Sequence, residues 1–175
     1  VVVADAGLDT TVTAAIQEIL ARPRDAAKTI TDVLDMRARI TRERPPRHPF
    51  DLKLAPGGLL DLEFIAQSGQ LVARTRIAAP QLPTAPTLER LEAAGLLPEG
   101  ARLAEIHEFY ATVQQVMSAA LVNPFKDEGW TSGFRELLIG LTNQPSFERL
   151  TDELRAMQQE VSAAAEQWYA RAALP

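Results

Sequence analysis

The chain has 175 residues and contains no cysteine, and its only histidines are His48 and His107. These absences exclude a disulfide framework, thiol catalysis and zinc sites built from cysteine and histidine, and they favour a reducing compartment. No apolar run approaches the roughly 18 residues that a membrane span requires. The first residues, Val-Val-Val-Ala-Asp, also lack the basic segment of a signal peptide. We therefore expect a cytoplasmic protein with no membrane partner.

The chain also has few positive charges. It contains 18 lysines and arginines and 23 acidic residues, which give a net charge of −5. Nucleic-acid-binding domains usually carry a basic total, so we expect no nucleic-acid partner. The length is sufficient for one domain with its own hydrophobic core. Because the chain begins with Val1 and not with methionine, we expect it to be part of a longer polypeptide.

Apolar residues recur with helical spacing along nearly the whole chain, and strict alternation over five or more residues is scarce. This pattern predicts an all-α fold, an up-and-down helical bundle with a four-helix-bundle-like core and extra short helices. The expected helices cover approximately residues 12–20, 25–40, 59–77, 87–94, 103–121, 134–141 and 147–168. The apolar positions of the last helix also fit an intermolecular coiled coil, but we favour packing within the bundle.

Proline and polar residues mark the ends of these helices. Pro23 and Pro45 are expected to end the first two helices, because proline and the residue before it disfavour helix continuation. Asp25 and Thr87 are expected to begin two others as N-caps.

The connections define the predicted domain organisation. Residues 50–54 form the one stretch that suits an extended conformation, and a turn at 55–58 follows it. A proline-rich loop at 80–86 joins two sub-halves, 9–79 and 87–175. Both belong to a single helical domain over residues 9–175.

No common catalytic motif is present. The sequence lacks a phosphate loop ending in Gly-Lys-Ser/Thr, a Gly-x-Gly-x-x-Gly turn, a Gly-x-Ser-x-Gly elbow and a His-Glu-x-x-His helix. His107 lies on an expected helix without a serine or cysteine partner nearby, so we interpret it as an ordinary, partly exposed histidine. We expect no catalytic residue and no metal ligand set in this chain.

One segment differs from its surroundings: Lys53 leads into a Gly57-Gly58 turn, which opens onto a helix carrying Asp61 and Glu63. In a functional interpretation, the amides of the helix start and Lys53 bind a phosphate, because adjacent glycines allow close backbone approach. In a structural interpretation, the glycines form a tight turn and the two carboxylates complement the helix dipole. Spacing alone favours the structural interpretation. The carboxylates are about 200° apart on a helix, so they cannot hold one metal ion together.

Arginines are concentrated just upstream of this segment. Five occur within eleven residues, namely Arg37, Arg39, Arg42, Arg44 and Arg47. Such a cluster can form a basic rim for a nucleotide or an acidic partner. A solvated helix face balanced by neighbouring acidic residues is an equally good interpretation.

The residues Asp51-Leu52-Lys53, Gly57-Gly58 and Asp61-Leu62-Glu63-Phe64-Ile65-Ala66-Gln67 resemble a known signature. It is the Asp-Ile-Lys…Gly-Gly-Ile-x-Asp-Ile-Glu-Phe-x-x-Gln signature of the bacterial glutamine synthetase adenylyltransferase family. The upstream Pro23-Arg24-Asp25 and residues 32–40 resemble the stretch that precedes the signature in that family. Together with the helical pattern, the resemblance covers most of residues 1–122.

The resemblance implies a large two-headed enzyme that attaches AMP to a tyrosine of glutamine synthetase and removes it by phosphorolysis. Each head pairs a nucleotidyltransferase domain, which binds Mg²⁺ and ATP, with a following helical domain of the substrate-binding type. This chain resembles the helical domain behind the C-terminal, adenylylating head, and residues 1–8 would be the tail of the preceding nucleotidyltransferase domain. It contains neither the Gly-Ser turn nor the Asp-x-Asp pair of those heads. The catalytic carboxylates and the Mg²⁺ and ATP sites are therefore expected outside it.

One role implied by the resemblance is nucleotide binding. Lys53 would contact a phosphate, while Gly57 and Gly58 would allow the close backbone approach. Asp61 and Glu63 would orient Lys53 or contact ribose.

The other implied role is that of a non-catalytic interaction module. The domain would then dock glutamine synthetase or the PII signalling protein through the face of residues 37–47, with Arg39, Arg42 and Arg47 as the contacts, or through a groove of the bundle. The related helical domain of PII uridylyltransferases is the alternative to the adenylyltransferase family.

Overall fold

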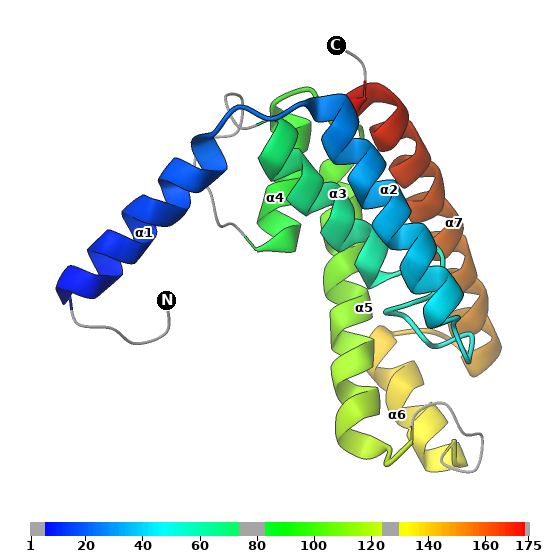
Figure 1. Ribbon diagram of the computed structural model, residues 1–175. Coiled ribbons are helices and arrows are strands. Elements are labelled where there is room, and N and C mark those ends of the chain that lie inside the picture. Colours follow the sequence, from blue (N-terminus) through cyan, green and yellow to red (C-terminus); the bar gives the residue numbers. More distant parts are fainter. Residues whose placement is uncertain (1–5, 74–82, 124–129, 174–175) are drawn as a thin grey trace.

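The computed structural model describes residues 6–73, 83–123 and 130–173, apart from the side chains of residues 6, 20 and 21. Within these residues the chain forms seven helices and no strands, so the all-α prediction is confirmed (Figure 1). The helices are α1 (Ala6–Ala21), α2 (Ala26–Glu43), α3 (Leu59–Val72), α4 (Thr84–Ala93), α5 (Gly100–Ala120), α6 (Ser132–Thr142) and α7 (Phe147–Ala172).

Side-chain caps fix the starts of three helices. The Asp25 carboxylate accepts a hydrogen bond from the amide of Lys28 at 3.0 Å, which confirms the predicted N-cap of α2. Thr131 and Ser146 cap α6 and α7 in the same way. A cap of this kind contributes about 1 kcal/mol, because it satisfies an amide that has no partner within the helix.

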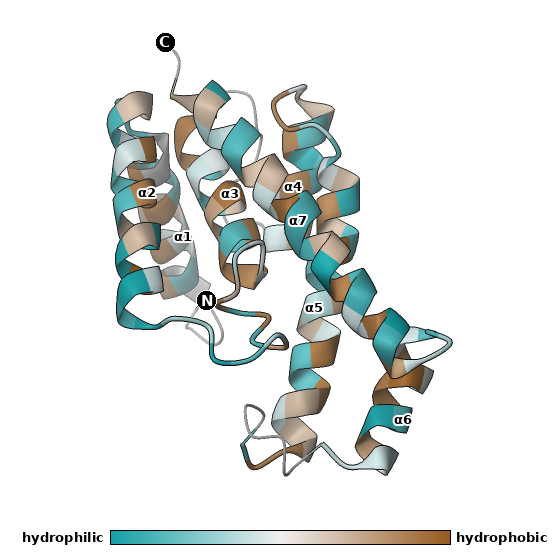
Figure 2. Ribbon diagram, turned by 90° about the vertical axis from the view of Figure 1, so that its right-hand side faces the viewer, coloured by the Kyte–Doolittle hydropathy of each residue, from teal (hydrophilic) through white to brown (hydrophobic). Residues whose placement is uncertain are grey.

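Helix α3 lies at the centre of the bundle and contacts α2, α4, α5 and α7. Helix α4 also pairs with α5, and α7 also contacts α2. Helix α6 lies at one end, where it contacts both α5 and α7 (Figure 2). Fully buried side chains from these helices belong to one hydrophobic core, among them Leu62, Ile65, Leu88, Ile106, Leu150 and Val161. Burial of each such side chain contributes about 1.5–3 kcal/mol.

Helix α7 packs within its own chain. Leu150, Leu154, Met157, Val161 and Trp168, which the apolar spacing singles out, are all buried. The predicted packing within the bundle is therefore confirmed.

Helix α1 runs away from the other helices in Figure 1. Leu8 and Ile19 on this helix are 57% and 48% exposed. The apolar spacing thus predicts the helix correctly, but it does not show whether its apolar side chains are covered.

The prediction of an extended segment at residues 50–54 is wrong, because this stretch forms consecutive turns. The amides of Leu54 and Ala55 donate to the carbonyl of Asp51 at 3.1 and 2.9 Å. The buried Asp51 carboxylate accepts from the amides of Arg47 and Leu54 at 3.3 and 3.4 Å. An aspartate that bonds to nearby backbone amides stabilises a turn and competes with extended structure.

Aromatic rings hold this turn segment against α6 and α7. The ring centroid of Phe50 lies 4.7 Å from that of Trp130 and 5.5 Å from that of Phe147. His48 stacks on Trp130 at 5.1 Å, and Phe134 meets the same indole edge-on at 5.3 Å. Tilted and offset arrangements of this kind are the favourable ones for aromatic pairs.

Helix α4 begins three residues before the predicted cap. Its first residue is Thr84 and its N-cap is Pro83, so the prediction that Thr87 caps the helix is wrong. Thr87 is fully buried inside the helix, and its hydroxyl donates to the carbonyl of Pro83 at 2.9 Å. Pro86 is tolerated because it falls in the first turn, where amides have no intrahelical partner.

Helix α3 ends at Val72, earlier than the predicted boundary near residue 77. Residues 6–8 of the predicted N-terminal tail form the start of α1. Parts of three other predictions lie outside the described residues: 1–5 of the tail, 80–82 of the proline-rich loop and 124–129 of the loop before α6. The division into residues 1–8 and 9–175 stays a prediction.

Candidate functional site

Asp61 lies at the start of α3, with its side chain 10% exposed, and it is engaged within the chain. Its Oδ1 accepts from Nε of Arg37 at 2.5 Å, and its Oδ2 accepts from the second guanidinium nitrogen at 3.1 Å. The amide of Gly57 also donates to Oδ2, at 2.7 Å. The carboxylate therefore links α2 to the turn before α3, and its oxygens are directed to protein donors.

The two glycines of the turn are required by the packing of the chain on itself. Gly57 has a φ of 72°, and a Cβ atom added to it would lie 1.8 Å from the carbonyl oxygen of Gln158 on α7. A Cβ atom added to Gly58 would lie 2.3 Å from the carbonyl oxygen of Leu52. The close backbone approach that the glycines allow is thus made by α7 and by the preceding turn.

The first amides of α3 are also satisfied within the chain. Leu59 donates to the carbonyl of Leu52 at 2.8 Å, and Leu60 donates to that of Lys53 at 3.2 Å. The amide of Asp61 donates to the carbonyl of Gly58 at 3.1 Å. An anion at a helix N-terminus needs unpaired amides. This helix start therefore agrees with the structural interpretation of the turn.

Lys53 is exposed and lines a cavity of about 270 Å³ together with Arg44 and Arg47. The acidic residue in the wall is Asp51, whose carboxylate is bonded to backbone amides as described above. The wall of this cavity thus carries three cationic side chains, and such side chains can bind a phosphate or a carboxylate. We call this site the cationic cavity.

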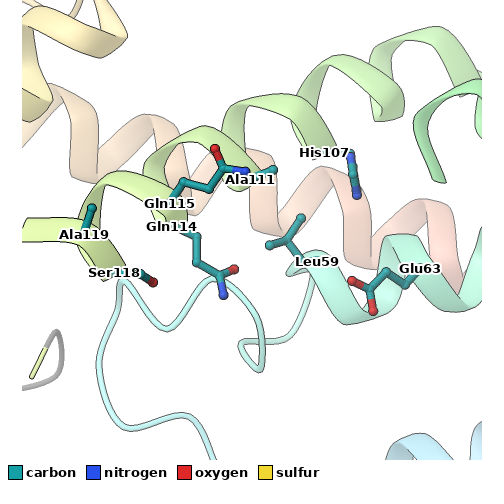
Figure 3. A pocket seen from close by; sticks show the side chains of 8 residues that line it. All are labelled: Leu59, Glu63, His107, Ala111, Gln114, Gln115, Ser118 and Ala119. Atoms are coloured by element: carbon teal, nitrogen blue, oxygen red, sulfur yellow. The ribbon is translucent and has the colours of Figure 1, made fainter. Parts of the chain in front are cut away.

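Glu63 is half-buried and lines a second cavity of about 480 Å³ between α3 and α5. In Figure 3 it shares this opening with His107 and Gln114 of α5. The Nδ1 atom of His107 and the Oε1 atom of Gln114 are buried without a hydrogen-bond partner. Burial lowers the pKa of His107, and the carboxylates of Glu63 and Glu108 partly oppose this effect. We call this site the polar cavity.

Helix α5 joins the two cavities, because Gln114 and Ser118 line both of them. Among the predicted nucleotide-binding residues, Lys53 lies at one cavity and Glu63 at the other, whereas Gly57, Gly58 and Asp61 line neither. Sequence reasoning did not select Gln114 and Ser118. The signal that was present is a polar stripe at helical spacing, which consists of His107, Gln114, Gln115 and Ser118.

The predicted partner-binding arginines are separated in the structure. Arg39 and Arg42 are exposed on α2, and Arg39 forms an ion pair with Glu43 at 2.9 Å. Arg47 instead lies at the cationic cavity. Of these three arginines, only Arg47 therefore lines the cationic cavity.

No group of three or more histidine or acidic side chains is placed to hold a metal ion in the described parts of the chain. Among the helices formed by these residues, none has the length and apolar character needed to cross a membrane.

Comparison with known proteins gives consistent results. Residues 34–119 match the family model described as GlnD PII-uridylyltransferase. The bifunctional glutamine synthetase adenylyltransferase/adenylyl-removing enzyme of Mesorhizobium japonicum is 38% identical over 90% of this chain and 16% of its own length. The enzymes of the same name from Brucella suis and Caulobacter vibrioides are 37% and 36% identical, over 79% and 87% of this chain and 14% and 16% of their own lengths. No solved structure matches the chain.

The helical fold and the match over residues 34–119 make the chain similar to the class of helical domain that the PII-uridylyltransferase family model describes. Within that class, the chain belongs to the glutamine synthetase adenylyltransferase family. The longer relatives carry the name of this family. It spans only about one sixth of the length of the relatives that it matches.

Proposed function

We propose that the protein containing this chain transfers AMP from ATP to a tyrosine of glutamine synthetase and removes it by phosphorolysis, and so regulates nitrogen assimilation. In this proposal the catalytic carboxylates, Mg²⁺ and ATP belong to a preceding nucleotidyltransferase domain in the cytoplasm. The helical domain assists the binding of the nucleotide or the protein substrate. The names of the relatives support the overall activity.

The observation that carries the domain's role is the cationic cavity, where the signature lysine meets two arginines. Lys53 comes from the turn before α3, whereas Arg44 and Arg47 come from the end of α2 and the residues that follow it. Phosphoryl-transfer reactions depend mainly on positioning and electrostatic stabilisation of charged oxygens. A domain that presents fixed cations can therefore contribute without supplying an acid, a base or a nucleophile.

The test is AMP transfer from ATP to glutamine synthetase by the full-length enzyme, followed by intact mass. Lys53→Ala is expected to lower the rate at least tenfold and to leave the melting temperature unchanged, because the side chain is exposed. Lys28→Ala is the matched control, since Lys28 is also exposed but pairs with Asp32 on α2. Equal rates for all three proteins would refute the role of Lys53. An absence of transfer by the wild type would refute the proposed activity itself.

The exposed arginines of α2 favour a second candidate function, namely docking of glutamine synthetase or the PII protein. Arg39 and Arg42 are exposed and do not line the cationic cavity. In this case Arg39→Ala together with Arg42→Ala would weaken binding of the partner protein and make it less sensitive to salt. ATP binding would stay at the wild-type level. Unchanged partner binding at low salt would refute docking through this face.

A further inference from the structure

The two cavities on α5 differ in chemistry but share a wall. Gln114 and Ser118 line both, so the cationic cavity and the polar cavity meet along one face of the helix. The polar cavity, at about 480 Å³, lies within the range of about 300–1,000 Å³ that small-molecule sites have, and the cationic cavity, at about 270 Å³, lies just below it. A ligand that contacts Gln114 and Ser118 lies at the boundary of both cavities.

The cationic end selects a ligand group with more than one negative charge. Arg44, Arg47 and Lys53 place three cationic side chains in the wall, and the carboxylate of Asp51 in the same wall is bonded to backbone amides. Arginine and lysine side chains are the usual partners of phosphate groups. The apolar side chains of Phe50 and Met117 lie in the same wall and reduce the exposure of a bound anion to water.

The polar end selects a ligand group that donates hydrogen bonds. The Oε1 atom of Gln114 is buried and has no donor, and the Glu63 carboxylate is a further acceptor in the same cavity. Nδ1 of His107 is buried without a partner as well. A buried polar atom without a partner costs about 1–3 kcal/mol, and this cost is removed when the Gln114 side chain turns its Oε1 atom into the cavity and a ligand donates to it. Sugar hydroxyls and amino groups are such donors.

We propose that the face of α5 binds a nucleoside phosphate, with the phosphate at Arg44, Arg47 and Lys53 and the nucleoside at Glu63, His107 and Gln114. The choice of a nucleotide, and of AMP as the probe, rests on the proposed function. The pairing of a phosphate end with a hydrogen-bond-donating end rests on the two cavities alone. Gln114 and Ser118 are the residues that connect the two ends.

The experiment is calorimetric titration of the 175-residue chain with AMP, with adenosine and with inorganic phosphate. AMP is expected to bind more tightly than either of its parts, because only AMP contacts both ends. Lys53→Ala is expected to weaken AMP binding at least tenfold and to reduce its dependence on salt, while adenosine binding stays unchanged. Lys28→Ala should bind AMP as the wild type does.

Gln114→Leu distinguishes binding from packing. Because its Oε1 atom lacks a partner in the ligand-free chain, this substitution is expected to leave the melting temperature unchanged or raise it. AMP and adenosine binding should nevertheless weaken at least tenfold. A lowered melting temperature with unchanged AMP binding would assign Gln114 a structural role and overturn the proposal.

The remaining outcomes are also decisive. Failure of the wild-type chain to bind AMP, or binding of phosphate as tight as that of AMP, would overturn the two-ended site. If the chain binds AMP as described but the full-length enzyme transfers none, the site stands and the proposed function fails. If the enzyme transfers AMP and the chain binds none, the proposed function stands and this site fails.

Discussion

Arg37 and Asp61 form an ion pair that joins two helices and the signature turn, although they are 24 residues apart in sequence. Their side chains are only 13% and 10% exposed, and the guanidinium also reaches the carbonyls of Leu54 and Ala55 at 3.4 and 3.3 Å. The arginine cluster and the signature are thus parts of one structure. Arg37 organises the turn from which Lys53 projects.

Removal of one partner of this pair should destabilise the fold. Asp61→Ala leaves the guanidinium of Arg37 and the amide of Gly57 without their acceptor, and we expect a loss of about 3–5 kcal/mol. Urea denaturation of the chain measures it. Arg39→Ala breaks an exposed pair and should change the free energy of unfolding by no more than about 0.5 kcal/mol. Equal stabilities for Asp61→Ala and the wild type would show that the pair has no structural role.

Two glycines with similar φ angles should differ in their response to alanine. Gly57 and Gly95 have φ values of 72° and 69°, but an added Cβ atom meets the Gln158 carbonyl at Gly57 and nothing within 4 Å at Gly95. Gly95→Ala should cost only the strain of the left-handed conformation, about 1–2 kcal/mol. Gly57→Ala adds a backbone clash with α7 and should cost more than 3 kcal/mol or prevent folding. Thermal unfolding compares the two variants, and similar melting temperatures would contradict the clash.

A buried side-chain hydrogen bond links α3 to α7. Nε1 of Trp168 donates to Oγ of Ser68 at 2.8 Å, and both residues are buried. Ser68→Ala leaves the indole N–H without an acceptor and should cost about 1–3 kcal/mol. Ser132→Ala, at an exposed position, should cost less than about 0.5 kcal/mol. Chemical denaturation measures both, and a Ser68→Ala variant as stable as the control would show that the bond contributes nothing.

Stability should depend on pH through His107. Burial keeps the pKa of His107 lower in the folded chain than its ordinary value of about 6.5. The unfolded chain therefore binds the proton more readily, and the contribution of the neutral imidazole is lost as the pH falls below that ordinary value. Between pH 7.5 and pH 5, His107→Gln should lose less stability than the wild type. Urea denaturation at several pH values in this range measures the free energy of unfolding of both proteins. Parallel losses in both proteins would rule out this linkage.

Helix positions follow from the sequence where apolar spacing determines them, as in α7. The N-terminus of α4 could not be predicted from the sequence. Thr87 has the side chain of a cap, but it is buried within the helix. Its hydroxyl accepts a hydrogen bond from Nε2 of Gln70 on α3 at 2.9 Å. The partner of a polar side chain on another helix cannot be derived from local pattern. The same limit applies to residues 50–54, where Asp51 and distant aromatic rings determine the turns.

The residues of the candidate site could likewise be predicted from the sequence only in part. Lys53 and Glu63 could be selected because they lie in one contiguous signature, and the structure places each at a cavity. Gln114 and Ser118 lie far along the chain, on a helix whose polar stripe resembles an ordinary solvent-facing surface. Their relation to Lys53 arises only when α5 packs beside the turn segment.

The contact between Gly57 and the backbone of Gln158 has a consequence for synthesis on the ribosome. Translation releases the turn early and α7 last, so the surface that receives Gly57 does not exist while the first half of the chain emerges. Gly57 can pack against the backbone of Gln158 only after α7 has left the exit tunnel. The residues that line the cationic cavity end at Ser118, so translation delivers all of them before it reaches α7.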